Sequence, residues 1–450
     1  MRKKKSFEVT DPYFQERLLF WSGKHEVACV LNSNHDTQLF SDPYSTQDII
    51  VAVGAIDQLL NPEPNNQNSF DLLKDFYESK KDWLFGFFTY DLKNDSGRPG
   101  EKLKSENNDE HGFPIVHFFQ PRLIVIHNKE HSIMEILFLE KYDSASSVQQ
   151  IFDEISETTI PDADVHEVTI QHRVSKKEYV STVSQIKEHI QRGDIYEMNY
   201  CMEYFSAGSP IHPVHAYQRL NAISPMPFSC FYKLQDHYLM CASPERFVAK
   251  RKSAIISQPM KGTARRGKNR EDDEVLRQWL NKDPKERSEN VMIVDLVRND
   301  LSRTAKKGSV QVNELFGVYA FQQLHQMIST VVSEMKDEIH FTEVIKNLFP
   351  MGSMTGAPKI RAMQLIEQFE KTKRGLYSGS VGYISPEGDF DFNVVIRSIL
   401  YHQKKKYLSF MVGSAITANS VVEKEYDECL LKATAMLQAL TFLKEVVING

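Results

Sequence analysis

The segment Ser378–Val412 reads SGSVGYISPEGDFDFNVVIRSILYHQKKKYLSFMV, and its pattern of apolar residues decides the fold class. Strand-like runs at Ser378–Ser385, Phe390–Tyr401 and Tyr407–Val412 follow one another, separated only by short polar turns. No helical pattern lies between them, whereas a doubly wound parallel sheet requires a helix after each strand. The segment therefore favours an α+β fold over a doubly wound one.

Helices and strands on either side of this segment come in mixed order. Ser175 is a suitable N-cap for a helix that Gly193 ends. Pro358 suits the first turn of a helix that runs through Phe369. The other elements that we expect are helices at Glu271–Asn281, Lys285–Asp300 and Glu423–Lys444, strands at Tyr196–Tyr204, Ser229–Lys233 and Tyr238–Cys241, and a hairpin of Leu123–Ile126 with Ile133–Leu139.

The composition excludes several classes of protein. The chain has 450 residues, of which 41% are hydrophobic and 25% charged, and its formal net charge is −6. Such a surface has no general attraction for nucleic acid or anionic membranes, so an anionic ligand needs a local basic site. The longest apolar stretch, Ile49–Ile56, is too short to cross a bilayer, and five scattered cysteines suit a reducing compartment. We expect a cytoplasmic enzyme without nucleic-acid or membrane partners.

Four familiar motifs are absent or misleading. His127–His131 spells the HxxEH zinc pattern, but that chemistry needs a helix, and these residues fall in the expected hairpin turn. The chain has no GxxxxGK[ST] or GxGxxG loop for a nucleotide. None of its cysteines lies in a GxCxG elbow, so the nucleophile of a typical glutaminase is missing.

Sequence blocks whose residues could bind a ligand or take part in catalysis lie in the second half of the chain. Lys261 lies beside Gly262, whose backbone N–H can approach an anion closely. Glu425, Glu428 and Lys432 fall at i, i+3 and i+7, hence on one face of the last helix. Each block alone also fits a turn, a helix cap or a surface ion pair. The blocks are Ser243–Phe247 (SPERF), Gln258–Thr263 (QPMKGT), Asp295–Asp300 (DLVRND), Gly352–Lys359 (GSMTGAPK, whose N–H groups could receive an anion) and Glu425–Lys432 (EYDECLLK).

Together and in this order, these blocks resemble those of the chorismate-utilising enzymes. The resemblance extends through PMKGTARRG, DLVRNDLSR, GSMTGAPKIRAM, RGLYSGSVGYIS, VVIRS and EYDECLLKA. It implies the α+β chorismate-binding fold, with two packed β-sheets and helices outside. It also implies a chorismate-binding catalytic domain at residues 165–445, after an N-terminal region of the anthranilate synthase component I type at residues 1–160.

The resemblance assigns most of a binding site for chorismate, a dianion with a ring carboxylate and an enolpyruvyl carboxylate. Metal-binding glutamates of the family fall on Glu289 and Glu428, which implies Mg²⁺ bridging to the ring carboxylate. Arg397, with Tyr377 beside it, takes the family position that binds the second carboxylate. A family active-site histidine falls on His325, in a run that we expect to be helical. Further substrate contacts are implied at Gly262, Thr263, Gly413, Ser414, Ala415 and Lys432.

Position 261 separates two branches of the family. The anthranilate-forming branch has a small residue there, whereas the aminodeoxychorismate-forming branch has lysine, as this chain does. The resemblance implies that Lys261 attacks ring C2 while Glu245 protonates the departing C4 hydroxyl, and that ammonia then adds at C4. Lys261 must then be partly neutral, which requires a lowered pKa. Glu245 must hold its proton near pH 7.

Other interpretations stay open beside amination at C4. The chain could be an anthranilate synthase component I, an isochorismate- or salicylate-type enzyme, or a chorismate-binding scaffold without catalysis. Because no glutaminase motif is present, the amination interpretation requires ammonia from a separate glutamine amidotransferase subunit.

The chain also departs from the family pattern. Glu197 stands where a glutamine is usual, Asn290 where a histidine is frequent, and Met351 where glycine is common. Ala415 adds a methyl group to a loop that is richer in glycine elsewhere in the family. These changes affect single contacts and leave the family assignment intact.

Overall fold

The structure is a computed structural model that describes residues 1–34, 42–45, 48–61, 68–95, 103, 105–128, 131–162, 168–322 and 324–441. Its strands are β1 Lys3–Glu8, β2 Val27–Asn32, β3 Ile49–Asn61, β4 Leu84–Phe88, β5 Val116–Asn128, β6 Ile133–Phe138, β7 Gln171–His172, β8 Glu197–Ala207, β9 Phe228–Leu234, β10 His237–Ser243, β11 Arg246–Arg251, β12 Ala254–Ser257, β13 Met260–Arg265, β14 Gln311–Ala320, β15 Leu324–Glu334, β16 Gly356–Ala357, β17 Ser380–Ile384, β18 Phe390–Asn393, β19 Ser398–His402 and β20 Tyr407–Thr417. Its helices are α1 Phe14–Gly23, α2 Ser69–Lys80, η1 Tyr90–Asp95, α3 Ala145–Glu157, α4 Lys176–Gln191, α5 Pro213–Ile223, α6 Arg270–Lys282, α7 Pro284–Ser302, α8 Phe341–Leu348, η2 Gly352–Met354, α9 Lys359–Phe369 and α10 Val422–Leu440.

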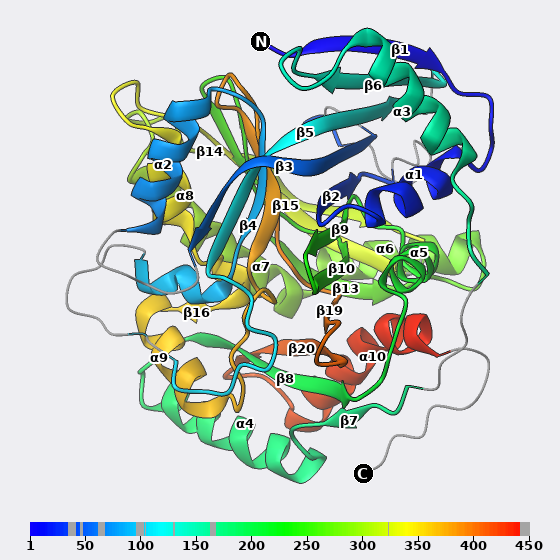
Figure 1. The fold of residues 1–450 in the computed structure, drawn as a ribbon. Helices are drawn as coiled ribbons and strands as arrows, with labels where there is room; N and C mark the ends of the chain where they lie inside the picture. The colour runs from blue at the N-terminus through cyan, green and yellow to red at the C-terminus, as the bar shows by residue number, and fades with distance from the viewer. Residues whose placement is uncertain are drawn as a thin grey trace.

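The long strand β5 joins two antiparallel layers (Figure 1). One edge of β5 pairs with β3, and from there pairing continues through β2, β9, β10, β19, β20 and β8. The other edge pairs with β6 and, at Val116–Phe119, with β4. From β4 the pairing runs through β17, β18, β11, β12 and β15, which also pairs with β13 and β14.

Buried aromatic and aliphatic side chains hold the two layers face to face. One core cluster takes residues from β2, β3 and β9 on one side and from β4 and β17 on the other. The rings of Phe87 on β4 and Tyr232 on β9 meet edge to face, 5.1 Å apart. A second cluster packs α1, α3, α4, α5 and α10 on the first layer, and a third packs α2, α7 and α8 on the second. The predicted α+β fold, with two packed sheets and outer helices, is therefore confirmed.

Local sequence signals explain several elements. Ser175 caps α4 in a capping box with Glu178, as the sequence predicts. The predicted strand Phe390–Tyr401 is wrong as a single element, because β18 and β19 are separate strands. Arg397, just before β19, has a left-handed backbone (φ 50°), which breaks the ladder although the apolar run continues. The last helix, predicted to Lys444, is described to Leu440, and residues 442–450 lie outside the described ranges.

The HxxEH pattern does not lie on a helix. His127 is in β5 and His131 in the turn before β6, while residues 129 and 130 fall outside the described ranges. The two strands pair in antiparallel register, which confirms the predicted hairpin. In the described ranges, no helix has the length and apolar character needed to span a membrane. The boundary between residues 160 and 165 stays a prediction; pairs β2–β9 and β4–β17 connect the two sides of it.

Candidate active site

A buried ion pair between β13 and β8 lies at the centre of the candidate site. Lys261 Nζ donates to Glu197 Oε1 over 2.7 Å, and the two side chains are 11% and 2% exposed. Burial alone would lower the pKa of Lys261, but the charges of Glu197, Glu289 and Glu428 outweigh it and raise that pKa. The lowered pKa that a nucleophile requires is therefore absent here, because carboxylates surround the ammonium group.

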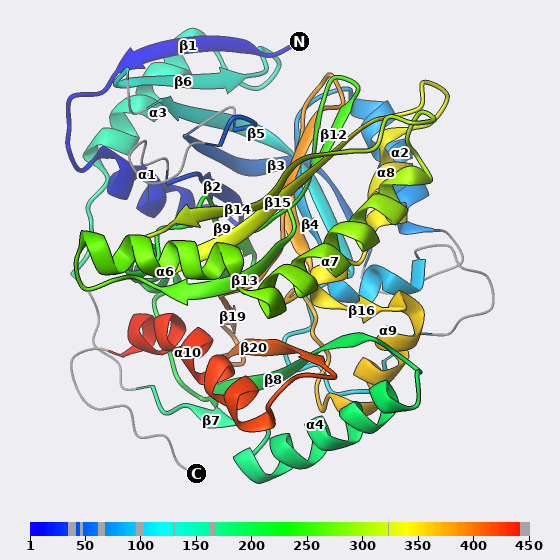
Figure 2. The ribbon, with the colours of Figure 1, turned by 180° about the vertical axis from the view of Figure 1, so that it is seen from behind.

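Two helices supply the other carboxylates: α7 packs against β13 (Figure 2), and its Lys285 lies 3.8 Å from Glu425 of α10. Helix α7 carries Glu286 and Glu289, and α10 carries Glu425 and Glu428. Burial raises the pKa of Glu289 to about 7, although the charges of Lys261 and Lys285 oppose the shift. Glu289 Oε1 is buried and accepts no hydrogen bond from the described residues. This oxygen therefore lacks a hydrogen bond, although the ammonium group of Lys285 lies 3.7 Å from it.

Lysines offset part of this negative charge. Lys285 Nζ lies 3.7 Å from a carboxylate oxygen of Glu289 and 3.8 Å from one of Glu425. Lys432 Nζ forms a 2.7 Å ion pair with Glu428 and donates to the carbonyl oxygen of Gly413 over 2.8 Å. Although burial opposes it, the charge of Lys432 contributes most to a lowered pKa of Glu428. Glu428 therefore stays ionised beside a partly protonated Glu289.

The donor set here suits a hard divalent cation. Glu289 and Glu428 offer only oxygen ligands, which Mg²⁺ prefers over sulfur or nitrogen. The described residues contain no group of three His, Cys, Asp or Glu side chains arranged to hold a metal. A cation bound here would thus need further oxygens from water or from a bound carboxylate. Its charge would also stabilise the Glu289 oxygen that accepts no hydrogen bond from the described residues.

Glu245 has the electrostatic character of a general acid. It lies just before β11, is 5% exposed, and accepts a 2.7 Å hydrogen bond at Oε1 from Ser353 Oγ. Burial raises its pKa to about 7, even though the Ser353 hydrogen bond and the charges of Lys261, Arg397 and Lys432 oppose this. At neutral pH a substantial fraction of Glu245 is protonated, which agrees with the sequence-based requirement.

Arg397 is an available anion-binding group. Its guanidinium makes no hydrogen bond or ion pair with the part of the chain that the structure describes. Burial lowers the pKa of Arg397 to about 10, against the opposing charge of Glu245. A desolvated guanidinium without a partner is ready for a bidentate carboxylate. Tyr377 is buried with its hydroxyl 3.9 Å from Cys201 Sγ.

The predicted helix around His325 is wrong. His325 lies in β15, opposite Ala264 of β13 and Ala320 of β14, because the run is paired on both edges. Its ring Nε2 lies 2.9 Å from Asp273 Oδ1 of α6, whereas Nδ1 is buried without a hydrogen-bond partner among the described residues. Arg266 clamps the same carboxylate with two hydrogen bonds.

The predicted substrate-contact residues do not all face one way. Gly262 has φ 92°, and an added Cβ would lie 3.0 Å from Glu286 Oε2, so its backbone lines the acidic helix α7. Thr263 is exposed and donates to Gln326 over 3.3 Å. On β20, the buried hydroxyl of Ser414 contacts the hydroxyl of Tyr179 in α4 at 3.0 Å. Because side chains alternate along a strand, Gly413 and Ala415 face away from Tyr179.

The GSMTGAPK loop packs against β8 instead of standing open. Gly356 pairs with Met198, and a Cβ on Gly356 would lie 2.1 Å from the carbonyl oxygen of Glu197. Lys359 forms a buried ion pair with Asp300 at the end of α7. The loop thus holds Ser353 against Glu245 and fixes the start of β8, and the structure does not leave it as an open anion cradle.

A buried arginine that the sequence reasoning missed, Arg374, links the segments next to the candidate site. Arg374 forms a two-fold ion pair with Glu370 and donates to the carbonyl oxygens of Met354 and Asn199. Glu370 in turn accepts the backbone N–H of Cys201. These contacts tie α9, the GSMTGAPK loop and β8 together. The RGLYSG spelling contains this arginine, but the spelling alone does not show that it is buried.

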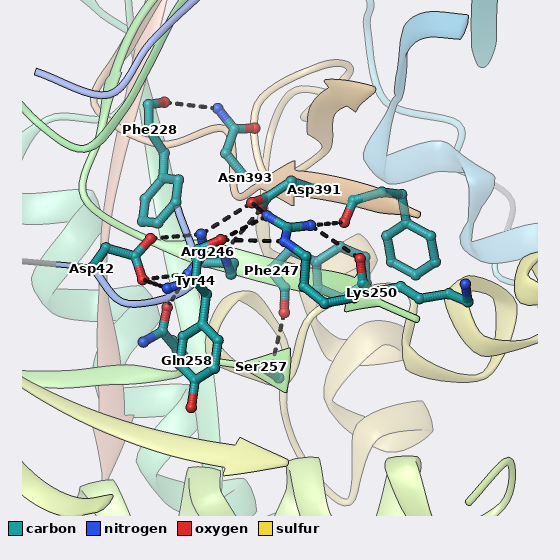
Figure 3. A network of polar contacts seen from close by, with 12 residues as sticks. Asp42, Tyr44, Phe228, Arg246, Phe247, Lys250, Ser257, Gln258, Asp391 and Asn393 are labelled. Carbon is teal, nitrogen blue, oxygen red and sulfur yellow. Dashed lines mark hydrogen bonds and ion pairs between the residues drawn. The ribbon is translucent and has the colours of Figure 1, made fainter. Parts of the chain in front are cut away.

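Arg246, the residue after Glu245, joins a second buried network (Figure 3). Its guanidinium donates to both oxygens of Asp42, both oxygens of Asp391 and Gln258 Oε1. It is 1% exposed and lies over the ring of Phe228 at 4.7 Å. The network therefore anchors the strand that follows Glu245 to β18 and to the segment before Lys261.

Comparison with known protein families identifies the class to which this chain belongs. The profile of the family described as chorismate binding enzyme matches residues 29–438, nearly the whole chain. The chain belongs to this family of chorismate-utilising enzymes.

Similar proteins include members of two amination branches of the family. The chain is 37% identical over 267 residues to aminodeoxychorismate synthase component 1 of Bacillus subtilis, covering 59% of this chain and 56% of that protein. It is 32% identical over 383 residues to anthranilate synthase component 1 of Acetivibrio thermocellus, covering 80% and 75%. The crystal structure of anthranilate synthase component I from Streptococcus pneumoniae superposes with a TM-score of 0.76 at 24% identity, covering 89% and 94% of the chains, which shows a shared fold.

The Arg246 network generates a prediction about stability. Replacing Arg246 with Met leaves the carboxylates of Asp42 and Asp391 short of a cation, and breaking buried ion pairs in this way costs about 3–5 kcal/mol. Urea unfolding followed by circular dichroism measures the loss. Arg277→Gln, which removes an exposed pair with Glu274 on α6, is the control and is expected to cost less than about 1 kcal/mol. Equal stability of the two variants would contradict the prediction.

Proposed function

We propose that this chain aminates chorismate at C4, giving 4-amino-4-deoxychorismate, and that Lys261 is the covalent nucleophile. The observation that carries the proposal is that a candidate nucleophile, Lys261, and a candidate general acid, Glu245, interact electrostatically in one buried site. Lys261 is buried beside glutamate side chains that raise its pKa. The positive charge of Lys261 also acts on Glu245, whose pKa burial raises to about 7. The similarity to proteins named aminodeoxychorismate synthase component 1 supports this branch.

In the proposed first step, the neutral amine of Lys261 forms a bond to ring C2. The ring double bonds shift, the C4–O bond breaks, and the leaving hydroxyl takes the Glu245 proton and departs as water. The lysine nitrogen then carries the positive charge, and Glu245 is ionised. Ser353 holds Glu245 at 2.7 Å, and Arg397 is free to bind the enolpyruvyl carboxylate.

The raised pKa of Lys261 is the feature that this step must overcome. Glu289 and Glu428 contribute to that raised value. Mg²⁺ held by these two carboxylates would supply positive charge and orient the ring carboxylate. A cation held there would offset part of the negative charge that keeps Lys261 protonated, and a larger fraction of the amine would then be neutral.

A second candidate function is amination at C2 to form anthranilate. The observation in its favour is the match to anthranilate synthase component 1, which covers more of this chain than the Bacillus subtilis match does. The lysine at position 261 argues against it, because that branch has a small residue there. Either reaction takes ammonia, which we propose comes from a separate glutamine amidotransferase subunit.

Product analysis tests the proposed function directly. Purified chain, chorismate, Mg²⁺ and ammonium salt at alkaline pH are expected to give a product with the mass of aminodeoxychorismate and no anthranilate fluorescence. With glutamine in place of ammonium salt, the chain alone is expected to form no product. Anthranilate or isochorismate as the main product would refute C4 amination. Glutamine-dependent product from the chain alone would refute the need for a partner.

Replacing Lys261 with Ala is expected to reduce C4 amination by about 10³-fold or more, because the covalent nucleophile is lost. Chorismate affinity, measured by calorimetry, is expected to change little, since Arg397 and the acidic site with Mg²⁺ remain. The control is Lys268→Ala, which removes an exposed lysine after the same strand. Near wild-type amination by Lys261→Ala would show that ammonia attacks without a lysine intermediate.

Metal binding is expected to appear in stability as well as in activity. Mg²⁺ should raise the thermal midpoint of the wild-type chain at pH 8, and Glu289→Gln should abolish this rise. Because the pKa of Glu289 is about 7, protons compete for the carboxylate as pH falls through 7, so the rise should shrink by pH 5.5. Glu271→Gln, at an exposed position of α6, should respond as the wild type does. A rise that persists in Glu289→Gln would exclude this site.

A further inference from the structure

Glu197 presents two carboxylate oxygens to the candidate site, and the described protein uses only one of them. Oε1 accepts the hydrogen bond from Lys261 at 2.7 Å. Oε2 is buried and has no hydrogen-bond partner among the described residues, and the whole residue is 1% exposed. Leaving a buried charged oxygen unsatisfied is costly, so this atom calls for a ligand that donates a hydrogen bond.

The backbone keeps this oxygen in place. Glu197 is the first residue of β8, paired with Thr417 of β20 on one edge and with Ala357 of β16 on the other. A Cβ added at Gly356 would lie 2.1 Å from the Glu197 carbonyl oxygen, so the loop backbone packs closely on this strand. With both neighbours fixed, the strand cannot shift to bring Oε2 into solvent. The unsatisfied oxygen is thus a fixed feature of the site beside Lys261.

We propose that Glu197 is a catalytic residue that binds the incoming ammonia through Oε2 while Oε1 holds the nitrogen of Lys261. The inference rests on the proposed function, in which ammonia is a substrate. Ammonia is a small neutral molecule with three N–H donors and one lone pair. Donation of one N–H to Oε2 leaves the lone pair free to attack.

The second step of the proposed reaction explains why a carboxylate is useful here. Ammonia forms a bond to C4, the ring double bonds shift back, and the bond between C2 and the Lys261 nitrogen breaks. The lysine leaves as a neutral amine, and the new C4 nitrogen carries the positive charge, so charge balances without any added proton. Glu197 faces the cationic nitrogen before and after this transfer, and a fixed anion stabilises the charge at both positions.

A glutamine, the residue usual at this position in the family, would give a weaker effect. Its amide oxygen can accept hydrogen bonds, but the side chain has no net charge to stabilise a forming ammonium group. Hydrogen bonds to a charged partner are roughly twice as strong as those between neutral groups. Because this chain has glutamate at position 197 where glutamine is usual, we expect it to bind ammonia more tightly than a chain with glutamine there.

The test is the substitution Glu197→Gln, which keeps the size of the side chain and removes its charge. Rates are measured against ammonia concentration at one alkaline pH with saturating chorismate, and against chorismate with saturating ammonia. The KM for ammonia is expected to rise about tenfold or more, while the KM for chorismate stays within about twofold. Glu203→Gln is the matched control, because Glu203 is buried in the same strand but pairs with Arg173.

Calorimetric titration with chorismate shows whether the variant site is intact. Unchanged ammonia KM and turnover in Glu197→Gln would overturn the proposal. A parallel loss of chorismate affinity would overturn it too, because the role of Glu197 would then be structural. The proposed function fails separately: if the wild-type product is anthranilate, C4 amination is wrong, yet a selective rise in ammonia KM would still support ammonia binding by Glu197.

Discussion

An excess of carboxylates over lysines, with Glu197 and Glu425 buried and Glu428 exposed, is the constraint on which this site depends. Five glutamates converge from β8, α7 and α10, and three lysines face them: Glu197, Glu286, Glu289, Glu425 and Glu428 against Lys261, Lys285 and Lys432. Buried charges are tolerated only when paired or neutralised. The raised pKa of Lys261 expresses this imbalance, whereas burial is the main cause of the raised pKa of Glu289.

The fold supplies the rigid frame that such a site requires. Arg374 and Arg246 are almost fully buried, and each ties several separate segments together directly behind the reactive groups. Neither guanidinium reaches substrate in the proposed chemistry. Their value lies in fixing the backbone around Glu197 and Glu245, because a misplaced acid or nucleophile loses rate steeply.

Sequence reasoning predicted the fold well where spelling or periodicity was strong, whereas the roles of the site residues stay predictions. Ser175, the hairpin of β5 with β6, and the helices that carry Glu289 and Glu428 follow from short-range patterns. It failed at His325 and at the break before β19. His325 is in a strand because of pairing partners distant in sequence, and Arg397 interrupts an apolar run through its backbone angle alone.

The electrostatics were the least accessible from sequence. The proposed role of Lys261 requires a lowered pKa, yet the pKa depends on the distances from Lys261 to glutamates in three other elements. The raised pKa of Glu245 was anticipated from its proposed task, but burial, its main cause, is a property of the folded chain. Residue types alone give neither the sign nor the size of such shifts.

The pairing of β4 with β17 has a consequence for synthesis of the chain. On the ribosome, the edge of β4 that will meet β17 emerges long before its partner, since Phe88 pairs with Ser380. Until then an apolar strand edge stands open to other chains, which is the usual starting point of aggregation. Closure of the second layer is consequently a late, non-local event, and contacts of that kind slow folding. Production of this protein should therefore be sensitive to temperature and to chaperone supply.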